Sequence, residues 1–171
     1  MYRYGISKYD PRLRDKSRRY FKEDWTGVGD IGKVYEGEKL TVSDYLKVED
    51  TYVSVIEAIL TVMNIPKLHV TNLRRVYSLK ELWKYHGHHE GLYDSKMIDY
   101  FSRAEGKKVV KKQEVETLIR LLLREDLTYL RMGYKDDLTI IIGYDYLMAV
   151  ETSVPIDSVI SEIEQKGLFV E

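Results

Sequence analysis

Apolar and polar positions along this chain follow two distinct periods. Between residues 127 and 151, three runs rich in Ile, Leu, Tyr and Val are separated by turn signals at 134–137 and 143–145. Such runs, bounded by Gly and Asp, are typical of antiparallel strands joined by short turns. We therefore expect a three-strand meander over residues 127–151.

Three further segments favour strands. Residues 2–9 alternate in polarity until Asp10-Pro11 ends the pattern, because proline supplies no donor to a strand ladder. We expect this N-terminal strand to dock into the sheet that the later chain builds. A weaker alternation predicts a strand near 67–76, and residues 168–170 favour a short terminal strand.

Helical spacing dominates the remaining long segments. Residues 41–64 place an apolar residue at every third or fourth position, with Thr41 as N-cap and Asp44 three positions later. We expect the charged Glu49 and Glu57 to lie mostly off that apolar face. Helices are also predicted at 111–126 and 155–166, with Gly167 ending the last, and shorter ones at 78–85 and 94–103.

This order of elements predicts an α+β fold. Helices would pack on a mainly antiparallel sheet, which is a layered arrangement with one core. The 171 residues fit one domain, and neither an internal repeat nor a linker divides them. We therefore expect a single α+β domain over residues 1–171.

Composition narrows the function classes. The formal net charge of −1 argues against a general nucleic-acid binder, and we expect no nucleic-acid partner. No apolar run is long enough to span a bilayer, and the N-terminus has no signal-peptide core, so we expect no membrane partner. The chain has no cysteine, which excludes disulfides and thiolate chemistry and fits a cytoplasmic location.

No pattern in the chain predicts a cofactor. Gly27, Gly29 and Gly32 have dinucleotide-motif spacing, but they follow a charged loop and no helix starts at them. We interpret the segment as a loop that Trp25 and Ile31 anchor onto the core. No nucleophile motif is present, and we interpret the paired carboxylates Glu125-Asp126 and Asp136-Asp137 as turn formers. We therefore expect neither a catalytic residue nor a cofactor.

One histidine cluster leaves an alternative open. His86, His88 and His89 fall together beside Glu90 in a glycine-flanked segment. Imidazole and carboxylate are the metal ligands available to a chain without cysteine, so a small metal-dependent hydrolase is one interpretation. The spacing matches no zinc-protease motif, and an exposed turn is the other interpretation.

The basic N-terminal segment is a candidate partner surface. Aromatic side chains anchor protein interfaces, and basic ones steer association with an anionic partner. The alternative is a solvated, charged loop. The candidate residues are Tyr9, Arg12, Arg14, Arg18, Arg19, Tyr20 and Trp25.

A resemblance to a known group covers residues 2–52. The residues that carry it are Tyr4, Ile6, Lys8-Tyr9-Asp10-Pro11, Arg14-Asp15, Glu23-Asp24-Trp25-Thr26, Asp30-Ile31-Gly32, Tyr45-Leu46-Lys47-Val48-Glu49 and Tyr52. In these the chain resembles small uncharacterised Firmicutes proteins of the polymorphic-toxin immunity type. The resemblance implies a cytoplasmic, non-enzymatic protein that binds a cognate toxin domain and masks its active site. It implies no particular site residue, and a regulatory or scaffold subunit with another protein partner is the alternative.

Overall fold

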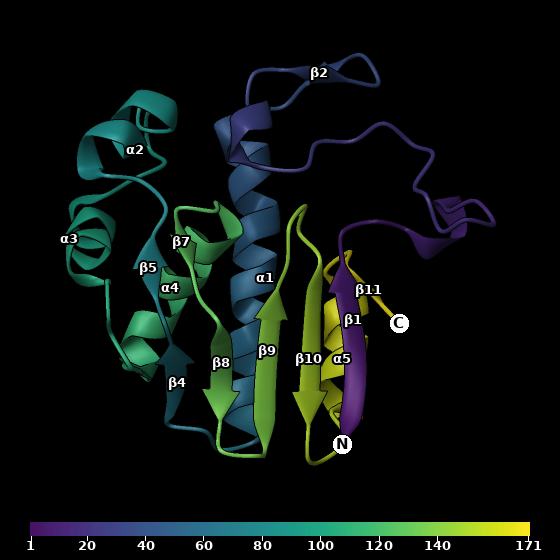
Figure 1. The fold of residues 1–171 in the computed structure, drawn as a ribbon. Coiled ribbons are helices and arrows are strands. Elements are labelled where there is room, and N and C mark those ends of the chain that lie inside the picture. The colour runs from purple at the N-terminus through teal and green to yellow at the C-terminus, as the bar shows by residue number, and fades with distance from the viewer.

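The structure is a computed structural model that describes all residues 1–171 (Figure 1). Its main feature is one seven-stranded sheet in which every neighbouring pair is antiparallel. The strands lie in the order β11–β1–β10–β9–β8–β4–β6. Their bounds are β1 Tyr2–Ser7, β4 Lys67–Thr71, β6 Val109–Lys111, β8 Arg131–Tyr134, β9 Leu138–Ile142, β10 Met148–Thr152 and β11 Phe169–Val170.

The predicted meander and its docked N-terminal strand are confirmed. β8, β9 and β10 follow one another along the chain and pair in that order. β1 then pairs with β10 on one side and β11 on the other, with Tyr4 opposite Val150 and Ile6 opposite Val170. The first strand of the chain therefore lies inside the sheet and not at its edge.

Five helices accompany the sheet, at the places that the apolar spacing predicts. Thr41 caps the first, and Ser78 forms a capping box with Glu81 at the second. None of the helices is both long enough and apolar enough to cross a bilayer. Their bounds are α1 Val42–Val62, α2 Leu79–Tyr85, α3 Ser95–Arg103, α4 Lys112–Leu123 and α5 Asp157–Gln165.

The helices cover one face of the sheet only. In Figure 1, α1, α4 and α5 lie behind the sheet, and no helix crosses the face turned to the viewer. Burial follows this layering, because Leu138 and Ile140 of β9 are buried while the next residue, Ile141, is exposed. The sheet and helices form the predicted α+β fold, with one uncovered sheet face.

Two predicted strands are interrupted. The segment near 67–76 divides into β4 and β5 (Arg74–Arg75) because Asn72 adopts a left-handed conformation with φ of 55°. The meander begins with β7 (Leu127–Thr128), which pairs with β5 and not with β9. A small hairpin of β2 (Val34–Tyr35) and β3 (Glu38–Lys39), joined by a turn at Glu36-Gly37, precedes α1.

The loop before this hairpin is anchored as expected. Trp25 is buried against the rings of Tyr45 and Tyr146, at centroid distances of 5.4 and 5.1 Å. Tyr146 also donates a hydrogen bond to the Tyr45 hydroxyl at 2.6 Å. These contacts hold Trp25, which precedes the glycine-containing loop 26–30, against the beginning of α1 and the β9–β10 turn.

Candidate functional site

A groove of about 990 Å³ lies on the uncovered side of the sheet. β8 and β9 pair as far as Met132 and Ile140. Past this pair, β9 and the segment that leads into β8 separate, and the groove lies between them. Beyond that pair the one strand that β9 pairs with is β10, and β7 pairs with β5. The groove is therefore a product of the split between two parts of the sheet.

Large apolar side chains line this groove. Leu130 is 75% exposed and Tyr144 77% exposed, while Val76 and Ile141 are also exposed. An exposed apolar surface of this kind marks a binding surface more often than an ordinary solvated face. Charged side chains of both signs lie among its lining residues, namely Glu125, Arg131 and Glu151.

Tyr129 closes the gap between the separated strands. Its hydroxyl accepts a hydrogen bond from the Ile142 N–H at 2.6 Å and donates to the Ile140 carbonyl at 3.3 Å. One side chain thus replaces the neighbouring strand along this edge of β9. A ligand in the groove consequently meets side chains there and not an open strand edge.

A smaller polar pocket of about 290 Å³ adjoins the groove. Tyr77 and Glu125 line both spaces, so the two are neighbours. The loop 26–30 forms one wall of the pocket, and the end of α4 forms another. His86 and Asp145 complete its polar lining.

His86 belongs to a buried three-residue arrangement. Its Nδ1 lies 2.8 Å from Asp126, and the Tyr93 hydroxyl donates to the other carboxylate oxygen of Asp126 at 2.6 Å. Burial raises the pKa of Asp126, and its hydrogen bonds to His86 and Tyr93 oppose that rise. With Asp126 ionised, Nδ1 carries a proton and the second ring nitrogen, Nε2, is the free position.

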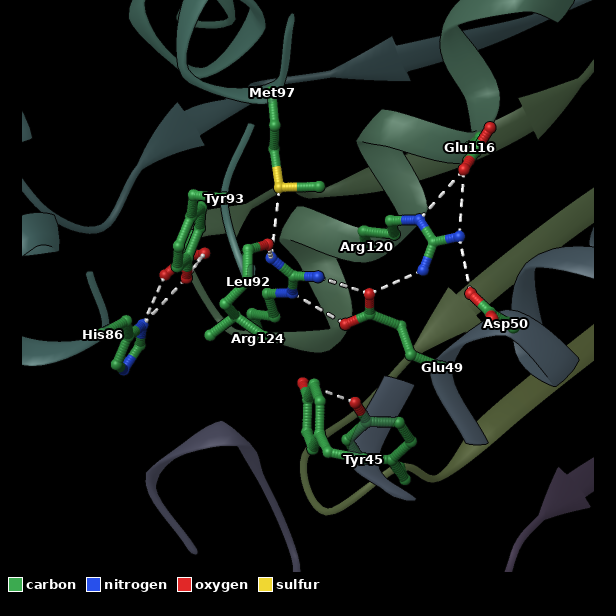
Figure 2. Close-up of polar contacts among 12 residues, drawn as sticks. Tyr45, Glu49, Asp50, His86, Leu92, Tyr93, Met97, Glu116, Arg120 and Arg124 are labelled. Atoms are coloured by element: carbon green, nitrogen blue, oxygen red, sulfur yellow. Dashed lines mark hydrogen bonds and ion pairs between the residues drawn. The ribbon is translucent and has the colours of Figure 1, made fainter. Parts of the chain in front are cut away.

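A second buried network lies beside the first (Figure 2). Arg124 donates two hydrogen bonds to Glu49, at 2.7 and 2.5 Å, and a third to the Leu92 carbonyl. Arg120 donates to the same carboxylate at 2.8 Å and also pairs with Asp50. Burial alone would lower the pKa of Arg124, but the bonds with Glu49 outweigh it and raise that pKa. The network is satisfied internally and joins α1 to α4.

The three candidate metal ligands are not brought together. His86 bonds to Asp126, whereas the rings of His88 and His89 pack against each other with centroids 4.1 Å apart. No three His, Asp or Glu side chains gather in a group that could hold a metal ion. The segment is a turn after α2, with His88 and Glu90 exposed.

The candidate partner residues at the N-terminus divide into two sets. Tyr9 and Trp25 are buried, and the Tyr9 hydroxyl donates a hydrogen bond to the Trp25 carbonyl. Both side chains are therefore part of the packed interior. Tyr20 packs edge-on against Tyr9 and is partly exposed. Arg12 pairs with Asp10 and Arg14 with Glu171, while Arg18 and Arg19 are exposed.

Sequence reasoning placed two buried carboxylates wrongly. Glu49 was expected off the apolar face of its helix, yet its side chain is fully buried between Arg120 and Arg124. Its position four residues after Tyr45 and three before Tyr52 was a signal that it shares their face. Asp126 does lie in a turn, but its side chain points inward to His86, and no local pattern announces that.

Comparisons with models of protein families, with curated proteins and with solved structures find no match for this chain. The geometry of the groove and the pocket is therefore what bears on function.

Proposed function

We propose that this chain is a non-enzymatic protein-binding protein that acts in the cytoplasm and neutralises a cognate bacterial toxin by covering the toxin's active site. The observation that carries the proposal is the apolar groove on the uncovered sheet face. Its lining combines large aliphatic and aromatic side chains with a few charges, which is the composition of protein interfaces. The resemblance over residues 2–52 supports the immunity class.

The groove suits docking by side chains. Leu130, Ile141 and Tyr144 project into solvent from three different segments, so a partner that covers them removes a continuous apolar surface from water. Arg131 and Glu151 lie beside them and can pair with opposite charges on the partner. Anchors of this kind, surrounded by polar residues, account for most of the affinity in protein complexes.

The neighbouring polar residues favour binding over catalysis. Asp126 is hydrogen-bonded to His86 and Tyr93, and Glu49 forms ion pairs with two arginines. These charged groups therefore interact with one another within the chain. No Ser, Thr or Lys side chain is hydrogen-bonded to His86 as an activated nucleophile would be. The separation of His86 from His88 and His89 likewise lends no support to the alternative of a metal-dependent hydrolase.

The basic N-terminal segment has a separate place in the proposal. Arg14 pairs with Glu171 next to β11, and the groove lies on β9, which β10 and β1 separate from β11. We propose that Arg12, Arg14, Arg18 and Arg19 steer an anionic partner during association, with Tyr20 as the accessible aromatic contact. Replacing the four arginines by Glu together with Tyr20→Ala would then slow association, most strongly at low salt.

Toxin neutralisation and direct affinity test the main proposal together. The proposed partner for this test would be the C-terminal toxin domain of a secreted protein encoded beside the gene for this chain. It would be produced with and without the chain in the same cells. The test variant carries Leu130→Glu and Ile141→Glu. The control carries Val34→Glu and Val62→Glu, which change two exposed valines away from the groove.

We expect the wild type and the control to restore growth and bind the toxin. The groove variant should bind at least about tenfold more weakly, a loss of about 1.4 kcal/mol. Thermal melting of both variants checks that they fold. Equal affinity of the groove variant and the wild type would show that the interface lies elsewhere. Failure of the wild type to protect against the toxin would remove the immunity class.

A further inference from the structure

The polar pocket beside the groove holds hydrogen-bond acceptors that nothing in the chain uses. It measures about 290 Å³, at the lower end of ligand-sized pockets. The first acceptor belongs to His86, which is only 8% exposed. Asp126 and Tyr93 both contact its Nδ1, while Nε2 has no hydrogen-bond partner in the chain.

His86 lines the pocket, and its free nitrogen lies on the side of the ring away from Asp126 and Tyr93. Figure 2 shows that the ring presents Nδ1 to Asp126 and Tyr93, and that its other nitrogen points the opposite way. Tyr77 packs edge-on against the same ring, with centroids 5.6 Å apart, and fixes the orientation further. When Asp126 is ionised and the ring is uncharged, Nδ1 carries the proton and Nε2 accepts a hydrogen bond.

Two carboxylates supply the remaining acceptors. Glu125 and Asp145 line the pocket, and neither forms a hydrogen bond or an ion pair with its side chain. Burial raises the pKa of Glu125, and the nearby charge of Asp145 raises it further. A carboxylate in this position gains from a cation that pairs with it.

The other charged residues at the pocket are already engaged. Asp30 accepts from Lys33 at 2.7 Å and from the Thr26 N–H at 2.8 Å. Arg124 is held by Glu49 and by the Leu92 carbonyl. The groups without a partner in the chain are therefore the two exposed carboxylates and Nε2 of His86. A ligand that carries positive charge and donates hydrogen bonds would complement them.

We propose that this pocket binds an organic cation, an alkylammonium or guanidinium group, through Glu125, Asp145 and Nε2 of His86. Charge-assisted hydrogen bonds to the carboxylates supply the affinity, and the imidazole supplies direction. The ring of Tyr77 adds an aromatic wall, against which a cation is stable. The acceptors do not form a group that could hold a metal ion, so an organic cation is the fitting ligand.

This inference goes beyond the proposed function, because it concerns a second site and a small ligand. The cation has two sources, a free amine or an arginine or lysine side chain of a protein lying in the groove. Tyr77 and Glu125 border both spaces, so a protein lying in the groove passes next to the pocket.

Titration with n-butylguanidinium chloride, followed by NMR of the histidine ring signals, tests the proposal on the whole chain. The signals of His86 are assigned by comparison with His86→Gln. Butyramide at equal ionic strength is the neutral probe. The test variant is Glu125→Gln with Asp145→Asn, and the control is Glu57→Gln with Asp136→Asn, which makes the same change of charge at exposed positions away from the pocket.

We expect a saturable shift of the His86 signals with the guanidinium probe and none with butyramide. The test variant should weaken binding by at least about fivefold, and the control should leave it unchanged. Absence of a saturable shift, or equal affinity of the test and control variants, would overturn the proposal. Since no protein partner takes part, this result is independent of whether the toxin proposal holds.

A second titration separates the two sources. The probe is a short peptide in which one arginine is flanked by leucines, and its affinity is compared with that of butylguanidinium. A gain for the peptide that Leu130→Glu abolishes assigns the cation to a protein side chain seated in the groove. Equal affinities of the two probes assign it to a free amine.

Discussion

Glu49 in the middle of α1 and Arg124 just after α4 form a fully enclosed ion pair. Arg124 donates to both oxygens of Glu49, at 2.7 and 2.5 Å, and both side chains are at most 1% exposed. The pair is bidentate, the arrangement in which an arginine and a carboxylate interact most strongly. Two helices that are far apart in the sequence are joined at this point.

Breaking this pair is expected to destabilise the protein strongly. Glu49→Leu leaves the Arg124 guanidinium buried without its carboxylate, which costs about 3–5 kcal/mol of unfolding free energy. Urea denaturation measures the loss. Glu57→Leu, on the exposed side of the same helix, is the control and should change the free energy by less than about 0.5 kcal/mol.

Removing both partners should restore most of the stability. A variant with Glu49→Leu and Arg124→Met replaces the pair by apolar side chains, and Arg120 keeps Asp50 and Glu116 as partners. If the double variant lost the sum of the two single losses, the residues would not be coupled.

Gly133 is expected to tolerate no side chain. A Cβ at this position would lie 2.0 Å from the carbonyl oxygen of Leu138, which is backbone of the paired strand and cannot move aside. Gly133→Ala should therefore lower the unfolding free energy by about 1–3 kcal/mol or more. Gly27→Ala, where a Cβ meets nothing within 4 Å and the backbone is extended, should have little effect. Thermal melting of the two variants compares them directly.

Stability should fall as the pH rises above the usual pKa of tyrosine. Burial raises the pKa of Tyr45, Tyr52, Tyr93 and Tyr146 above the ordinary value of 10.0. The folded chain then keeps protons that the unfolded chain releases, so the stabilisation is complete below pH 10 and declines above it. Each such tyrosine contributes a loss of about 1.4 kcal/mol per pH unit in that range.

Tyrosinate absorbance and urea denaturation, followed together between about pH 8 and about pH 11, check this dependence. We expect the buried tyrosines to ionise only as the protein unfolds. Tyr146→Phe should make the fall of the unfolding free energy with pH less steep, by the contribution of one tyrosine, about 1.4 kcal/mol per pH unit. A smooth ionisation of all 15 tyrosines before unfolding would contradict the prediction.

Tyr129→Phe should loosen β9 at the groove. The variant lacks the hydroxyl that accepts the Ile142 N–H, and an unmade hydrogen bond of this kind costs about 1 kcal/mol. Hydrogen exchange at the Ile142 amide should speed up by about fivefold. Tyr144→Phe is the matched control, because Tyr144 lines the same groove and its hydroxyl has no partner. Equal exchange in both variants would remove the role given to Tyr129.

The fold was predictable where local patterns coincide with packing. The caps at Thr41 and Ser78 mark helix starts through bonds within a few residues, and the alternation of Leu68 and Val70 marks the buried side of β4. The break of that strand at Asn72 was not predictable, because its left-handed backbone depends on how β4 and β5 join their separate partners.

The site was much less accessible to sequence reasoning. The groove lies between β9 and β7, which pair with different strands. No pattern of residues in the sequence predicts that these two strands are separated. The pocket brings together His86, Glu125 and Asp145, which only the packed elements make neighbours. The histidine cluster was noticed for its composition, but the group that His86 joins is Asp126 and Tyr93, from other parts of the chain.

The position of β1 between β10 and β11 has a consequence for how the protein is made. Residues 2–7 are synthesised before most of the sheet, yet their partners on either side are residues 148–152 and 169–170. The nascent strand β1 therefore has no neighbour in the sheet until those residues have been made. The sheet can be completed only after synthesis has passed residue 170.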